Sequence, residues 1–122
     1  MKELRTATGE PFRYKGSLDE ELIVYPSDRI GEPQDRAVVA ISPFAIRLVM
    51  GLIEKHGRLL MGACRDKPPL GSLGHFLKQE KQTPQILSYL IPVLAKEGFC
   101  RIGREGRAIT VEHVAERETK GS

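Results

Sequence analysis

The sequence predicts an α+β protein that is mainly helical, with three helices and a β-hairpin preceded by an N-terminal arm of short strands. Apolar residues recur at three- and four-residue spacing in three segments after residue 41, which is typical of amphipathic helices. Ser or Thr stands at the start of each segment, where it can cap a helix. Two short apolar segments around a glycine-bearing turn then predict the hairpin. We therefore expect an arm over residues 1–41, a folded domain over residues 42–113 and a flexible tail over residues 114–122.

The composition fits one small domain. The chain has 122 residues, of which 40% are hydrophobic and 6% aromatic, so we expect one core of mainly aliphatic side chains. The net charge of +3 and the isoelectric point near 9.0 allow a polyanionic partner without requiring one. The placement of the cations is more informative, because Arg101, Arg104 and Arg107 lie together in one short segment.

Several classes of function have no residues to support them. Cys64 and Cys100 lie far apart without metal-ligand or redox spacing, and the histidines are scattered, so we expect no metal. The chain lacks a glycine-rich phosphate loop and a legible catalytic set, so we expect no enzyme activity and no cofactor. No apolar run reaches the roughly 18 residues that span a bilayer, and residues 1–15 do not resemble a signal peptide, so we expect a cytoplasmic protein without a membrane partner.

The N-terminal arm contains two apolar islands, at residues 22–25 and 37–41, that are too short for helices. They predict short strands. Between them, residues 26–35 combine Pro and Gly with polar side chains and predict a turn. Residues 1–40 are the expected surface for a dimer or a protein partner.

The first helix is expected over residues 42–56. Ser42 is the predicted N-cap, and Pro43 follows at the first helical position, where its missing N–H costs nothing. Gly57 stands where a C-cap is expected. Residues 58–64 fit either a strand or a further helical turn, and the periodicity leaves both interpretations open.

The second and third helices follow a proline-containing loop. Ser72 is expected to cap a helix that runs to Gln79, and Thr83 to cap a longer helix over residues 83–97. Gly98 is expected to end the third helix, because glycine readily takes a positive φ. Residues 99–111 then predict the hairpin.

The segment TPQILSYLIPVLAKEGFCRIGREGRAITVE resembles the winged helix-turn-helix regulators of the ArsR and MarR type. Thr83 matches the cap of their third helix, and Leu87, Ile91 and Leu94 match its core face. Residues 94–99 match the step from that helix through Gly-Phe into the first strand of the wing. The resemblance implies a winged helix over residues 42–113.

In such a fold the third helix lies in the DNA major groove and the wing contacts the backbone or the minor groove. Gln85 is then the expected reader of a base. The other residues that the resemblance and their charge place at DNA are Thr83, Ser88, Tyr89, Lys78, Lys81, Arg101, Arg104 and Arg107. We therefore expect a sequence-specific, homodimeric regulator of transcription that binds double-stranded DNA.

Two alternatives stay open. A winged helix also serves as a protein-interaction module, for example in a replication or partition assembly. An accessory domain of a nucleic-acid enzyme is a further alternative. Each wing arginine also fits a merely solvated hairpin, and Tyr89 fits the edge of the core as well as a ligand contact.

Overall fold

The computed structural model describes residues 2–26, 38–63 and 67–114. This part of the chain contains three α-helices and seven strands in two antiparallel sheets, and it is 34% helical and 33% strand. The expectation of a mainly helical protein was therefore wrong. The expected turn at residues 26–35 and tail at residues 114–122 lie almost wholly outside the described residues.

The N-terminal sheet accounts for most of the difference. Its strands are β1 (Lys2–Arg5), β2 (Pro11–Gly16), β3 (Leu22–Pro26) and β4 (Val39–Ile41), paired in the order β1-β2-β3-β4. The islands expected as strands are β3 and β4, whereas β1 and β2 were missed. In β2, Phe12 and Tyr14 are buried while Arg13 and Lys15 are exposed, so only alternate residues carry an apolar signal. Because charged residues separate its two buried aromatic residues, the sequence of β2 resembles that of a polar, irregular segment.

The first two helices begin as the sequence predicts. Helix α1 (Pro43–His56) is capped by Ser42, whose side-chain oxygen accepts a hydrogen bond from the Ala45 N–H at 3.1 Å. It ends at Gly57, which has φ 77°. Helix α2 (Leu73–Gln79) is capped in the same way by Ser72, which accepts from the His75 N–H at 3.1 Å.

The third helix differs from the expectation at its start. Residues Pro84–Ile86 form a 3₁₀ turn, η2, and the α-helix α3 covers only Leu87–Lys96. The Thr83 backbone is extended, but its side chain makes no capping hydrogen bond. The end is as expected, because Gly98 has φ 83° and the Phe99 N–H donates to the Leu94 carbonyl at 2.9 Å.

The C-terminal sheet combines the hairpin with one further strand. The hairpin strands β6 (Cys100–Glu105) and β7 (Ala108–His113) are joined by Gly106 and Arg107, and Gly106 has φ 64°. Strand β5 (Arg58–Leu60) pairs with β7, which gives the order β5-β7-β6. The segment after Gly57, for which two interpretations were open, is therefore a strand.

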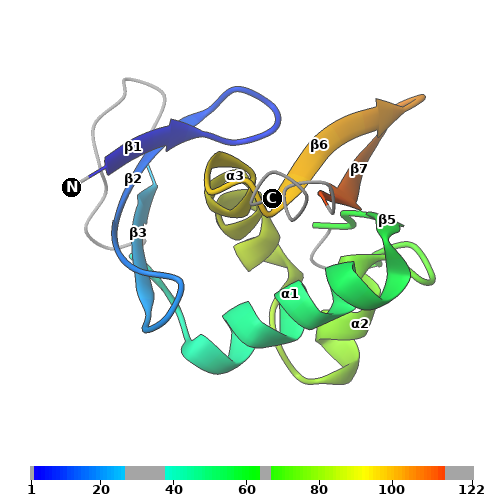
Figure 1. Cartoon of the computed structure of the whole chain (residues 1–122), viewed down its shortest axis with the longest axis horizontal. Coiled ribbons are helices and arrows are strands. Elements are labelled where there is room, and N and C mark those ends of the chain that lie inside the picture. The colour runs from blue at the N-terminus through cyan, green and yellow to red at the C-terminus, as the bar shows by residue number, and fades with distance from the viewer. Residues whose placement is uncertain (1, 27–37, 64–66, 115–122) are drawn as a thin grey trace, which may run out of the picture.

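Helix α3 is the centre of the core. Figure 1 shows it between the N-terminal sheet and the β6–β7 hairpin, with α1 and α2 below. Leu87, Leu90, Ile91 and Leu94 have no exposed surface, and the same core contains Phe12 and Tyr14 of β2. The described residues thus share one core, and the N-terminal sheet is part of it.

Candidate nucleic-acid interface

The turn from α2 to η2 carries four of the residues expected at DNA. Lys78 is the last cation of α2, Lys81 lies in the turn, and Thr83 and Gln85 flank Pro84; all four side chains are exposed. Pro84 and Ile86 are buried, so the 3₁₀ turn is anchored on one side and presents Gln85 outward. This cluster, which we call the turn cluster, lies at the N-terminal start of α3.

The backbone of the turn cluster is unusual at Lys81. The Lys81 N–H donates to the Lys78 carbonyl at 3.0 Å and the Gln82 N–H to the Leu77 carbonyl at 2.8 Å, which is the hydrogen-bond pattern of a Schellman motif. Lys81 has φ 61° and is the only residue other than glycine with a positive φ in the described part of the chain. The motif places a cation where glycine is usual.

Ser88 and Tyr89 lie in a different environment from the turn cluster. Both are only half-buried, but the Tyr89 ring meets the ring of Phe12 edge-on, with 5.2 Å between centroids. Burial, and next the charge of Glu10, raise the pKa of Tyr89. Farther along α3, Pro92 and Val93 are buried as well. The N-terminal sheet therefore occupies the face of α3 on which Tyr89 lies.

The three arginines of the hairpin have different surroundings. Arg101 stands opposite Glu112 in the β6–β7 register. Arg104 donates through Nη2 to the carbonyl of Ala7 at 3.3 Å and so joins the hairpin to the turn between β1 and β2. Arg107 is exposed in the turn of the hairpin. Of the three, Arg107 is the one that an approaching polyanion meets at the tip.

An acidic side chain offsets part of this charge. Glu105 lies 3.8 Å from the guanidinium of Arg58 on β5, and both side chains are more than half exposed. An exposed pair of this kind contributes little to stability. It does reduce the positive potential of the hairpin.

The described residues neither form a group that could hold a metal ion nor include a thiol that is ionised at neutral pH. Across residues 2–26, 38–63 and 67–114, no three His, Cys, Asp or Glu side chains are grouped so as to hold a metal ion. Burial raises the pKa of the Cys100 thiol to about 11, so it is not ionised at neutral pH. Cys64 lies outside the described residues, and no helix in the described part has the length and apolar character of a bilayer span.

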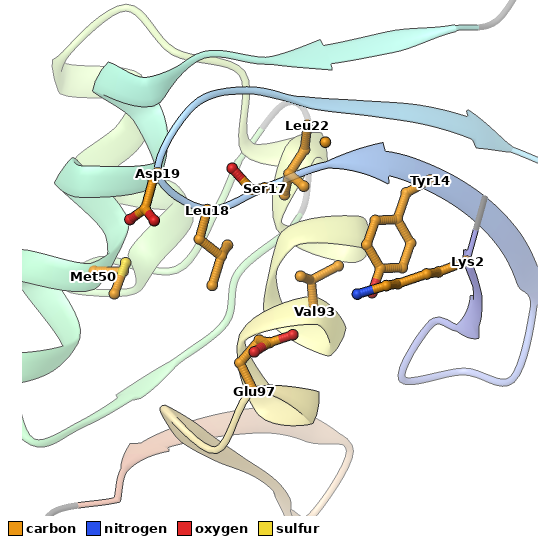
Figure 2. Close-up of a pocket in the computed structure, with 10 residues that line it drawn as sticks. Lys2, Tyr14, Ser17, Leu18, Asp19, Leu22, Met50, Val93 and Glu97 are labelled. Atoms are coloured by element: carbon orange, nitrogen blue, oxygen red, sulfur yellow. The ribbon is translucent and has the colours of Figure 1, made fainter.

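Sequence reasoning missed a cleft of about 320 Å³ between the N-terminal sheet and the helices. Figure 2 shows Lys2 and Tyr14 on one side of it, Asp19 and Met50 on the other, and Val93 and Glu97 from α3. The alternation in β2 is the signal that places Tyr14 on the inner face of its sheet. Nothing in the sequence indicates that α3 lies opposite.

The comparisons with known proteins do not add a relative. Neither a protein-family model, nor a curated protein, nor a solved structure matches the chain.

Proposed function

We propose that the protein binds double-stranded DNA through the turn cluster and the β6–β7 hairpin. The observation that carries the proposal is the exposure of Lys78, Lys81, Thr83 and Gln85 around the start of α3. Lysines suit phosphate contacts, and a glutamine side chain can pair with both N6 and N7 of adenine in the major groove. Together they provide affinity and a means of reading sequence.

The proposed contact uses less of α3 than a winged-helix regulator is expected to use. The middle of the helix is covered, because Tyr89 packs on Phe12 and Val93 is buried. Base reading is therefore assigned to Gln85, with Thr83 beside it. Ser88 and Tyr89 are assigned to the support of that end of the helix.

The hairpin supplies the second contact. Arg107 at the tip is proposed to meet a phosphate or the minor groove, and Arg101, near the opposite end of β6, to add positive charge at the base of the hairpin. Arg104 is proposed to hold the hairpin in place through the Ala7 carbonyl. Sequence-specific binding by so small a module is expected of a dimer, so the proposal includes a homodimeric regulator of transcription.

A variant series tests the two contacts. Lys81→Ala and Arg107→Ala each remove one proposed phosphate contact, and each should reduce the slope of log K against log salt concentration by about 1. The measurement is fluorescence anisotropy with a labelled random-sequence duplex. Arg13→Ala is the matched control, since Arg13 is an exposed arginine on the outer face of β2. Equal losses in all three variants would mean that net charge, and not this surface, attracts DNA.

A protein-interaction module is the second candidate, and one observation favours it. Phe44 on α1 is 50% exposed and Leu70, before α2, is 87% exposed. Phenylalanine is enriched in the cores of protein interfaces, so Phe44 is the side chain that would anchor such a contact. Binding of DNA that does not respond to salt, or no binding at all, would favour this candidate.

A further inference from the structure

The cleft beside Tyr14 contains an unusual polar group. Tyr14 is 2% exposed, and its hydroxyl is buried without a hydrogen-bond partner among the described residues. Buried polar atoms nearly always find a partner, because leaving one unpaired costs free energy. An orphaned hydroxyl at the edge of a cleft therefore suggests that a bound molecule supplies the partner.

Lys2 lies directly beside this hydroxyl. It is the register partner of Tyr14 in the β1–β2 pair, so both side chains stand next to each other on the same face of the sheet. Lys2 is exposed, and its long side chain can move. The Tyr14 hydroxyl has almost no exposed surface, so a molecule in the cleft meets the Lys2 ammonium group first and reaches the phenol O–H when the Lys2 side chain, which lies beside it in Figure 2, moves aside. Both groups are donors that suit a carboxylate.

Two acidic side chains also line the cleft, Asp19 on the side opposite these donors and Glu97 from α3. Glu97 follows the last turn of α3, and its charge adds to burial in raising the pKa of Tyr14, so the phenol keeps its proton. Asp19, in the turn between β2 and β3, provides a second carboxylate. Both suit an ammonium group on the same molecule.

Apart from Gly16 and Ser17, the rest of the lining is apolar. It consists of aliphatic and thioether side chains from the turn after β2, from β3, from α1 and from α3, namely Leu18, Leu22, Met50 and Val93. The cleft of about 320 Å³ is at the lower end of the range for small-molecule sites. It therefore has room for a compact ligand with an apolar body.

We propose that this cleft binds a small zwitterion of the class of free α-amino acids with aliphatic side chains. The ligand's carboxylate accepts hydrogen bonds from Lys2 and Tyr14. Its ammonium group lies against Glu97 and Asp19, and its side chain lies against the apolar lining. The proposal is independent of DNA binding, because every group that it uses lies outside the turn cluster and the hairpin tip.

Isothermal titration calorimetry of the full chain with each of the twenty free amino acids tests the proposal. At least one aliphatic amino acid should bind saturably at millimolar concentration. Its N-acetyl and carboxamide derivatives, each of which lacks one of the two charges, should bind more weakly. No saturable binding of any aliphatic free amino acid, or binding of the two singly charged derivatives as tight as that of the parent amino acid, would overturn the proposal.

Variants of two tyrosines assign the binding to this cleft. Tyr14→Phe should weaken binding about tenfold, the effect of losing one hydrogen bond to a charged group. The same variant should melt no lower than the wild type without ligand, since it removes only an unpaired hydroxyl. Tyr25→Phe, on β3 but outside the cleft lining, should bind as the wild type does. If Tyr14→Phe does not fold, Glu97→Gln takes its place with the same expected loss, and unchanged binding in the folded variant would overturn the proposal.

Discussion

Lys81 adopts a backbone conformation that most residues avoid. Its φ of 61° places the Cβ near the following carbonyl oxygen, a clash that glycine does not have. The two hydrogen bonds of the Schellman motif hold it there. A strained residue is often kept because its side chain has a use, and a lysine next to the start of α3 is suited to a phosphate contact.

Replacement of Lys81 should separate stability from binding. Lys81→Gly relieves the strain and should raise the free energy of unfolding by about 1 kcal/mol, while DNA binding weakens because the cation is lost. Urea denaturation and anisotropy measure the two effects. Lys78→Gly is the control, because it places glycine inside α2 and should lower stability by about 1 kcal/mol. A loss of stability in Lys81→Gly would contradict the described turn.

The buried thiol of Cys100 makes the free energy of unfolding depend on pH in the alkaline range. Burial raises the pKa of its thiol from 9.0 to about 11, so the folded protein keeps a proton that the unfolded chain loses near pH 9. Stability is therefore full below pH 9 and falls as the pH rises toward 11, by about 2–3 kcal/mol at the upper end. Urea midpoints across this window measure the fall. Cys100→Ala should flatten it, and an equal slope in both proteins would contradict this assignment.

At the scale of elements, the role proposed for α3 in DNA binding conflicts with its burial in the core. A recognition helix needs an exposed face, yet six of the ten residues of α3 are buried, and its surroundings include both sheets. The conflict is resolved at its start, where η2 buries Pro84 and Ile86 and exposes Gln85 between them. The proposed base-reading role is thus concentrated in a single turn.

Gln85→Ala tests that role. The side chain is exposed, so its removal should change the free energy of unfolding by less than about 0.5 kcal/mol. On a selected binding site the variant should lose about 1–3 kcal/mol of discrimination at one base position, with little change on random DNA. Binding selection from a random duplex pool, followed by sequencing, measures the preference. An equal loss on all sequences would show that Gln85 does not read a base.

The sequence predicts some elements well for identifiable reasons. Ser42, Ser72 and Gly98 mark helix ends through local hydrogen bonds and backbone preferences, which act within a few residues. Strand β2 was missed because its inner face carries only Phe12 and Tyr14, between charged residues. The 3₁₀ start at Pro84 was missed because Thr-Pro fits the first turn of either kind of helix.

The candidate site is predictable only in part. The exposed turn cluster and the hairpin tip follow from local patterns that the sequence carries. That Tyr89 packs on Phe12, and that Arg104 reaches Ala7, depends on contacts between residues far apart in the chain. The cleft at Tyr14 has the same origin, since its lining comes from both the N-terminal sheet and the helices.

At the scale of the whole molecule, both sheets share one core. Phe12, Tyr14 and Val24 of the N-terminal sheet belong to the same cluster as Leu90 of α3 and Val111 of β7. Separation of either sheet from the rest of the protein would therefore expose buried side chains of α3. This arrangement predicts a single cooperative unfolding transition.

Two probes measured in the same urea titration test cooperativity. Far-UV circular dichroism reports the helices, and tyrosine fluorescence reports mainly the N-terminal sheet and its contact with α3, through Tyr14, Tyr25 and Tyr89. The two curves should coincide. A tyrosine transition at lower urea would mean that the N-terminal sheet unfolds on its own.

The salt dependence of DNA binding tests the central claim most directly. The measurement is an anisotropy titration of the wild-type protein with a random-sequence duplex at several salt concentrations. If the turn cluster and hairpin contact phosphates, log K should fall linearly with log salt, with a slope of about −0.9 for each phosphate contacted, or about −3 for Lys78, Lys81 and Arg107 together. Absence of binding at the lowest salt, or binding that does not change with salt, would contradict the claim.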